Sequence, residues 1–317
     1  MAMNRIQFQP GLSLTEFLEQ YGTEERCEQA LELARWPEGY HCEHCASTHY
    51  CIVNAHGRKT YQCHRCHHQT TLKAGTIFHA SKLPLVRWFQ AMYLMSQSKN
   101  NISGLELKRQ LGVCYRTAWL IKHKLMQVMR EREADGVLTG RVIADDAYLG
   151  GERRGKRGRG SENKVPFIAA VEVDVADRPL RVRFDRVEGF CSESLSAWAK
   201  QHLAPQSTVL SDGLACFAAV TTADCQHEPQ VVGAARRSTD MPCFNWVNTL
   251  LGNLKTALSG TYHAFNFAKY ADRYLAEYQY RFNRRVNLKV MLPRLLQAAA
   301  TTGSRPETWL RMAELHR

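Results

Sequence analysis

Four cysteines form two Cys-x-x-Cys pairs, Cys42 with Cys45 and Cys63 with Cys66, and 17 residues separate the pairs. Each pair fits a tight turn that offers two thiolates to one ion, and two such turns complete a tetrahedral zinc site. Neighbouring histidines offer alternative ligands, although four cysteines are the simplest set: His41, His44, His64, His67 and His68. The spacing predicts a zinc ribbon over 37–80, with a small hairpin between the pairs and little room for a hydrophobic core.

Two aspartates, Asp145 and Asp212, stand at the ends of apolar runs of strand length, in VIADDAYLGG and TVLSDG. Strands that end in aspartates can present two carboxylates at one edge of a sheet, where they hold cations that prefer oxygen ligands. Paired magnesium ions at such a site activate the attacking oxygen and stabilise the leaving oxygen of phosphodiester cleavage. Aspartate also caps turns after strands very often, so these two residues alone do not decide between the two interpretations.

The segments that must position these residues change in character near residue 141. Before it, helical spacing predicts a helical lead over 13–36 and three helices over 84–132, of which the second ends at Gly112. After it, strand-length runs and helices form a mixed α/β pattern. The predicted strands are 141–149, 165–173, 180–187 and 208–212, and the predicted helices are 193–203, 245–258, 268–286 and 288–300.

The net charge of +12, with a pI near 9.3, favours a polyanionic partner, most commonly nucleic acid. Residues 81–132 hold ten Lys or Arg against two Glu, a surplus of eight positive charges. Their helices have the layout of a helix-turn-helix, in which Arg116, Lys122 and Lys124 are candidate DNA contacts. The alternative is a solvated basic face on a helical packing module; the concentration of charge beside a zinc ribbon favours DNA binding.

Two further basic segments have no single interpretation. A Gly-rich loop carries Arg153, Arg154, Lys156, Arg157 and Arg159. We expect it to grip phosphates close to Asp145, although a solvated loop has the same composition. The arginines of YRFNRR suit salt-bridged structure and DNA contact equally well, and His263 is either a neighbour of the metal site or a helix-end residue.

Composition argues against two other classes of protein. Eleven cysteines are an odd number in a long chain without a secretion signal, which does not fit a secreted disulfide scaffold. The sequence contains no run of 18 apolar residues, so no membrane partner is expected. We therefore expect a soluble, cytoplasmic protein.

Several stretches, taken in order, resemble the insertion-sequence transposases of the ISXO-type group, which have a zinc-ribbon N-terminus and an RNase H-like core. They span about residues 25–287, and their order and spacing make the resemblance specific. The matching stretches are RWPEGYHCEHC, the second cysteine pair, GTIFHASKLPLVRWF, LGVCYRTAW, DDAYLGG, KRGRGSENKVPF, LSDG, LKTALSGTYH and RYLAEYQYRFNRR.

The resemblance implies a catalytic set of Asp, Asp and then Glu or Asn, followed by a helical Lys. By position, this set falls on Asp145, Asp212, Asn248 and Lys255. The first three would hold Mg (or Mn), and Lys255 would position a phosphate or the DNA end. Asn248 and Lys255 are seven residues apart in a predicted helix, hence nearly on one face.

The chain departs from the family pattern at two places. Asp146-Ala147 replaces the Glu-Thr of many relatives, which matters little if Asp145 is the ligand. Asn248 stands where many relatives carry Glu, and its neutral amide should bind the second metal more weakly. Glu228 and Asp240 are alternative third ligands.

The sequence therefore predicts a multidomain protein with five segments. They are a helical lead (1–36), a zinc ribbon (37–80), a helix-turn-helix-like DNA-binding domain (81–135), an α/β RNase H-like catalytic domain (140–290) and a C-terminal helical tail (291–317). The resemblance implies a transposase that binds terminal inverted repeats on double-stranded DNA as a homodimer or larger assembly, then cleaves and transfers strands. The alternatives are a non-catalytic DNA-binding regulator derived from a transposase and another RNase H-like nuclease, such as a junction resolvase.

Overall fold

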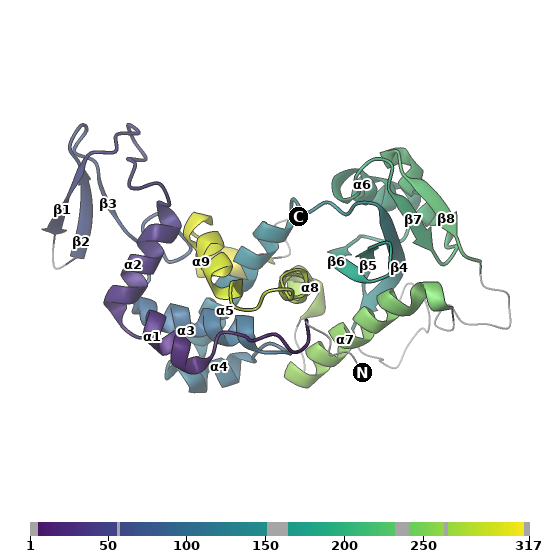
Figure 1. Cartoon of the computed structure of the whole chain (residues 1–317), viewed down its shortest axis with the longest axis horizontal. Helices are drawn as coiled ribbons and strands as arrows, with labels where there is room; N and C mark the ends of the chain where they lie inside the picture. Colours follow the sequence, from purple (N-terminus) through teal and green to yellow (C-terminus); the bar gives the residue numbers. More distant parts are fainter. Residues whose placement is uncertain (1–5, 56–57, 151–163, 232–240, 263–265, 314–317) are drawn as a thin grey trace. The chain divides into compact units, whose positions relative to one another are not determined.

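The computed structural model divides into two compact units, residues 1–128 with 286–311, and residues 129–285 with 312–317. The division falls inside the long helix α5 (Tyr115–Glu133). Figure 1 labels the elements along the chain. The structure describes residues 6–55, 58–150, 164–231, 241–262 and 266–313.

The first unit contains a small antiparallel sheet and a set of helices. The sheet has the order β1-β2-β3, and β1 and β2 form the hairpin predicted between the two cysteine pairs. The strands are β1 (Tyr50–Ala55), β2 (Arg58–Cys63) and β3 (Gln69–Thr71). The helices are α1 (Leu14–Tyr21), α2 (Glu24–Arg35), α3 (Leu85–Gln97), α4 (Gly104–Leu111), α9 (Met291–Thr301) and α10 (Glu307–Arg311), together with most of α5.

The ribbon has a small aromatic core that the sequence pattern did not predict. Trp36, Tyr40 and Tyr61 are each no more than 5% exposed. Trp36 packs edge-on against both tyrosine rings, at centroid distances of 5.1 and 4.9 Å. Two of these residues lie outside the strands, so strand-like alternation does not reveal them, and the expectation of a segment almost without a core is wrong.

A carboxylate joins α2 to α3. The backbone N–H groups at a helix start have no partner within the helix, and Pro84, which precedes α3, makes no side-chain cap. Glu24 of α2 supplies the missing acceptors, because its two carboxylate oxygens accept from Leu85 N at 2.7 Å and Val86 N at 3.0 Å. The start of α3 is thereby fixed against the helix that precedes the ribbon.

The last helices complete the first unit instead of forming a separate tail over 291–317. Helix α9 contacts α2 and α3, and its Leu292, Leu295 and Leu296 are buried. Its Ala299 carbonyl also accepts a hydrogen bond from Ile77 N at 3.4 Å. The apolar spacing of this segment predicted a helix correctly, but spacing does not say which unit receives the apolar face.

The second unit is built on a five-stranded mixed sheet of order β6-β5-β4-β7-β8. Strands β4, β5 and β6 are antiparallel neighbours, while β7 is parallel to β4 and β8 is parallel to β7. This order and these directions are those of an RNase H-like sheet. The strands are β4 (Arg141–Leu149), β5 (Val165–Val173), β6 (Pro179–Arg186), β7 (Thr208–Ser211) and β8 (Gln226–Pro229).

Helices cover both faces of this sheet (Figure 1). Val142 and Ala144 of β4 pack in one cluster with Trp198 of α6 and Phe217 of η1. Because side chains alternate along a strand, Asp145 belongs to the opposite face, where α7 contacts β4 and β5 and α8 contacts β5 and β6. The covering elements are α6 (Ser192–His202), η1 (Ala215–Ala223), η3 (Pro242–Phe244), α7 (Asn245–Thr261) and α8 (Phe267–Asn283).

The polar residues of the YRFNRR segment hold the second unit together. Glu133 at the end of α5 is buried and accepts from Gln279 Nε2 at 3.1 Å and Asn283 Nδ2 at 2.7 Å. Arg284 forms an ion pair with the same carboxylate, and Arg281 pairs with a buried glutamate one turn earlier. Arg281, Asn283 and Arg284 therefore have a structural role, which is one of the two interpretations that the sequence left open.

Candidate functional site

The four cysteines of the two pairs form one cluster. Cys42 Sγ lies 3.6 Å from Cys66 Sγ, and Cys45 Sγ lies 3.5 Å from Cys63 Sγ. All four sulfur atoms lie within 4.8 Å of one another, and within the described residues the cluster contains no histidine. Tetrahedral zinc with Zn–S bonds of about 2.3 Å separates its sulfurs by about 3.8 Å, so the cysteine set fits zinc.

Two matching turns present the sulfur atoms. In the first, Ala46 N donates to the Cys42 carbonyl at 2.8 Å, and in the second, His67 N donates to the Cys63 carbonyl at 3.0 Å. Ala46 and His67 both adopt positive φ angles, 58° and 56°, which turns the chain sharply after each pair. Backbone N–H groups, that of Cys66 first, lower the pKa of the Cys63 thiol, whereas burial and the neighbouring cysteine sulfurs raise the pKa of the Cys66 thiol. The thiolate is the form that binds metal.

The two strand-end aspartates also meet. Strand β4 runs parallel to β7 with Arg141 opposite Thr208 and Ile143 opposite Leu210. The same register, continued by two residues, sets Asp145 beside Asp212. Side-chain oxygens of these two residues and of Asp146 lie within 4.8 Å of one another, and all three residues are half-buried.

Backbone N–H groups orient two of these carboxylates. Asp145 Oδ1 accepts from Asp146 N at 2.9 Å, and Asp212 Oδ1 accepts from Leu214 N at 3.1 Å. The second contact is a turn cap, so the two interpretations of a strand-end aspartate both apply to Asp212. One carboxylate can cap a turn through one oxygen and keep the other for a cation.

Helix α7 carries the two remaining members of the expected catalytic set. Asn248 is half-buried and Lys255 is exposed, and α7 contacts β4 and β5, the strands that carry and flank Asp145. The alternative ligand Glu228 is exposed on the outer strand β8, opposite Leu210, and is not part of the acidic cluster. Asp240, His263 and the basic loop over 153–159 lie outside the described residues.

The structure corrects two candidate DNA contacts. Lys122 and Lys124 are 2% and 5% exposed, and their Nζ atoms donate to the carbonyls of Ile102 at 2.7 Å and Ile77 at 2.8 Å. Burial also lowers the pKa of Lys124. Every residue of α5 from 121 to 129 is buried. The two lysines therefore hold neighbouring loops through their carbonyls and do not lie on the surface, where their charge suggested they would be.

Arg116 remains accessible, since 76% of its side chain is exposed. It lies in the first turn of α5, directly after the turn that follows α4. Among the three candidate contacts predicted in the helix-turn-helix, it is therefore the one placed where a partner can reach it.

Comparisons with known proteins agree with both centres. Residues 137–283 match the ISXO2-like transposase domain, and residues 22–69 match the transposase zinc-ribbon domain. "Uncharacterized protein in transposable element ISH50" of Halobacterium salinarum is 24% identical over 175 residues. That alignment covers 49% of this chain and 57% of the relative's length.

One solved structure gives a weaker likeness. The crystal structure of the Mos1 strand transfer complex matches with a TM-score of 0.22 and 10% identity, over 69% of this chain and 78% of that one. A TM-score this low does not establish a shared fold.

The cysteine cluster and the RNase H-like sheet with its clustered aspartates lie in the two segments that match transposase domains. The resemblance drawn from the sequence is confirmed. The matched ribbon begins at residue 22, before the predicted boundary at 37, and so includes α2. Among the described residues, none of the helices combines the length and apolar character needed to cross a bilayer.

Proposed function

We propose that this chain is the DNA transposase of an insertion sequence. The first unit binds the terminal inverted repeats, and the second cleaves DNA strands and joins them to target DNA. The observation that carries this proposal is the meeting of Asp145 and Asp212 at the ends of β4 and β7, on a sheet whose face is covered by α7. The partner is double-stranded DNA in the cytoplasm, bound by a homodimer or larger assembly.

Each residue of the expected set has a distinct role in this chemistry. Asp145 and Asp212 supply the negative charge that holds magnesium or manganese, and Asn248 adds an amide oxygen. Bound ions at such a site activate the attacking oxygen and stabilise the leaving oxygen. Lys255 binds a phosphate of the DNA end as a point charge.

The environment of Asn248 supports its assignment as a ligand. Its Nδ2 is buried without a hydrogen-bond partner among the described residues. A buried polar atom without a partner costs about 1–3 kcal/mol. The oxygen and nitrogen of an amide exchange places on a half-turn of the group, which would bring Oδ1 to the buried position, where a cation can satisfy it.

The main competing function is a transposase-derived regulator that binds DNA without cutting it. Such a regulator has no use for clustered carboxylates, which repel one another unless protons or cations neutralise them. The acidic cluster therefore favours catalysis. A junction resolvase is less favoured, because a structure-selective nuclease does not need a ribbon and a sequence-reading helical segment.

The proposal is tested by incubating the full-length protein with duplexes that carry candidate inverted repeats, in Mg²⁺ or Mn²⁺. We expect nicks at the 3′ ends of the repeats, followed by joining of those ends to a target duplex. Specific binding without nicks in either metal would show that the chain is the regulator. Cutting that depends on branched DNA structure and not on repeat sequence would favour the resolvase.

Asn248 gives a graded test of the third ligand. We expect Asn248→Ala to lower the cleavage rate by about 10-fold or more, less than the loss of a carboxylate ligand, because a neutral amide contributes less to metal binding. Asn248→Glu should retain or raise the rate, because a carboxylate adds full charge at similar reach, and its metal optimum should shift to a lower concentration. Rates measured across a Mg²⁺ titration provide the comparison.

The matched control for this test is Asn253→Ala on the same helix, where the asparagine is exposed. It should leave both the rate and the metal optimum unchanged. An unchanged rate in Asn248→Ala would remove Asn248 from the metal site.

A further inference from the structure

The helix-turn-helix leaves one end of α5 open to a partner. Helix α4 ends at Gly112, whose φ of 64° is left-handed, and α5 begins three residues later at Tyr115. Tyr115 and Arg116 are exposed, whereas α5 is buried from Ile121 to Met129. DNA-reading helices of this motif contact base edges with their N-terminal residues, so the exposed part of α5 is the part that can read bases.

Arg116 is held in place at this end by the C-terminal segment. Its Nε lies 2.9 Å from Glu307 Oε2 and 3.2 Å from Oε1, and its Nη2 lies 2.8 Å from Oε2. Only 19% of the Glu307 side chain is exposed, whereas 76% of the Arg116 side chain is. Glu307 therefore grips one edge of the guanidinium group while most of the arginine faces solvent.

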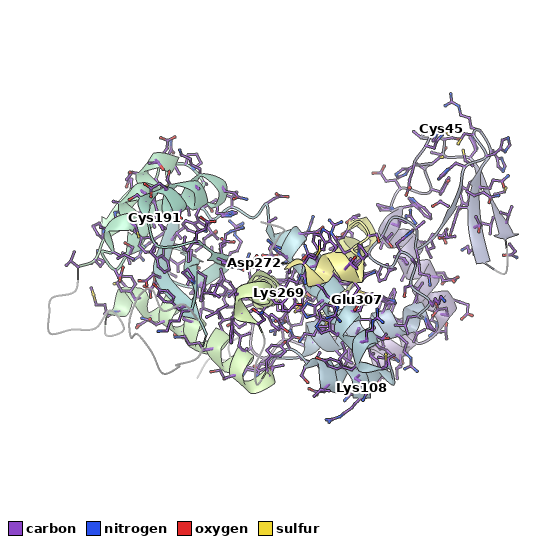
Figure 2. The ribbon with its side chains drawn as sticks, turned by 180° about the vertical axis from the view of Figure 1, so that it is seen from behind. Cys45, Lys108, Cys191, Lys269, Asp272 and Glu307 are labelled. Atoms are coloured by element: carbon purple, nitrogen blue, oxygen red, sulfur yellow. The ribbon has the colours of Figure 1, made fainter. Side chains whose placement is uncertain are left out.

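A second arginine fixes the carboxylate. Arg311 Nε donates to Glu307 Oε1 at 2.9 Å, and its guanidinium carbon lies 4.3 Å from the centroid of the Trp119 ring on α5. Glu307 is thus held from two sides, and α10 is tied to the first turns of α5 through Arg116 and Trp119. Figure 2 labels Glu307 in this unit.

We propose that Arg116 is a base-reading arginine, specific for guanine in the major groove, and that Glu307 is the residue that positions it. An arginine contacts guanine O6 and N7 through two N–H groups at once. Arg116 donates to Glu307 through Nε and one N–H of Nη2. The two N–H groups of Nη1 and the second N–H of Nη2 remain for the base. This inference rests on the proposed function, because it supposes that the first unit recognises a DNA sequence.

Holding the arginine before DNA arrives makes the contact more selective. A free arginine side chain has many conformations, and ordering it on binding weakens the complex. A fixed guanidinium meets a base at one place and in one orientation, and a wrong base leaves its N–H groups without acceptors. Lys108 and Arg109 are exposed in the last turn of α4, and no carboxylate among the described residues forms an ion pair with them. They suit phosphates, which carry no sequence information.

The test is selection of duplexes from a randomised library by the full-length protein. Binding to the selected sequence and to its single base-pair variants is then measured. We expect the wild type to prefer guanine at one position by about tenfold or more. Arg116→Ala should lose that preference and keep the others, and Arg116→Lys should lose it too, because an ammonium group cannot form the paired contact. Glu307→Gln should weaken the same preference alone.

Arg178→Ala is the matched control, because Arg178 is 75% exposed and pairs with Asp174, itself 19% exposed, in the second unit. It should keep every base preference. Lys108→Ala should weaken binding to all sequences alike.

The failures are distinguishable. If the wild type selects no sequence, the proposed recognition of inverted repeats fails. If a sequence is selected and Arg116→Ala keeps every preference, the base-reading role is wrong while the proposed function stands. If only Glu307→Gln keeps the guanine preference, Glu307 does not position the arginine.

Discussion

Asp145→Asn is expected to abolish DNA strand cleavage while leaving DNA binding intact, and Asp212→Asn should do the same. Each substitution removes a full negative charge from the site where oxygens of the two residues lie within 4.8 Å of each other and of Asp146. Mutating a group that only supports a metal ligand costs about 10- to 100-fold, so the loss of a ligand itself should exceed about 100-fold. Cleavage rates in Mg²⁺ and affinities measured by titration separate the two properties.

Asp146→Asn is the sharpest comparison for this experiment, because it removes the same charge from the adjacent residue. The Asp146 carboxylate lies in the same cluster as those of Asp145 and Asp212, but Asp146 is not a member of the expected catalytic set, so we expect Asp146→Asn to lower the cleavage rate less than Asp145→Asn does. Full activity in Asp145→Asn would overturn the catalytic assignment. Loss in Asp146→Asn with activity kept in Asp145→Asn would transfer the ligand role to Asp146.

Cys63→Ser is expected to lower the zinc content from about one ion per chain to almost none and to unfold the ribbon turns. Apparent binding energies of structural zinc in small zinc-binding peptides are about 10–16 kcal/mol, whereas a whole domain is stable by about 5–15 kcal/mol. The core of Trp36, Tyr40 and Tyr61 consists of only three rings that pack on one another, so we do not expect it to replace the ion. Metal analysis and amide hydrogen exchange measure the outcome.

Cys51→Ser is the matched control for the zinc experiment. Cys51 lies in β1 of the same sheet and is half-buried, but it is not part of the sulfur cluster. It should retain the zinc and the protection of β1 and β2 against exchange. A wild-type protein without zinc, purified in the absence of chelator, would contradict the assignment of the ribbon as a metal site.

Much of the fold follows from local sequence patterns. Strands β4 and β5 have the predicted bounds, since each is an apolar run with clear ends. Strand β8 was missed because QHEP has no alternation; it exists through its pairing with β7, which no local pattern records. The 3-10 segment η1 was missed for a similar reason, because its buried Phe217 and Val220 match a cluster formed by distant residues.

The candidate site divides in the same way. Ligand types and their spacing identified the cysteines and the two aspartates, because metal chemistry restricts both. Basic residues are less restricted, since a lysine on an amphipathic helix has the same sequence signature whether it meets solvent or a buried carbonyl. Lys122 and Lys124 both donate to buried carbonyls. No local sequence pattern indicated a role for Glu307, because its partner Arg116 lies 191 residues away in the chain.

The first unit is assembled from both ends of the chain, and this affects the order in which its parts become available during synthesis. A ribosome completes the whole of residues 129–285 before it makes α9, which buries its leucines in the first unit. Domains generally fold as units while the chain emerges, but this unit has to wait for α9 and α10. A prematurely terminated chain that ends before residue 286 therefore lacks part of the core of its ribbon-bearing unit. Such a fragment would be poorly suited to occupy DNA sites in competition with the full-length protein.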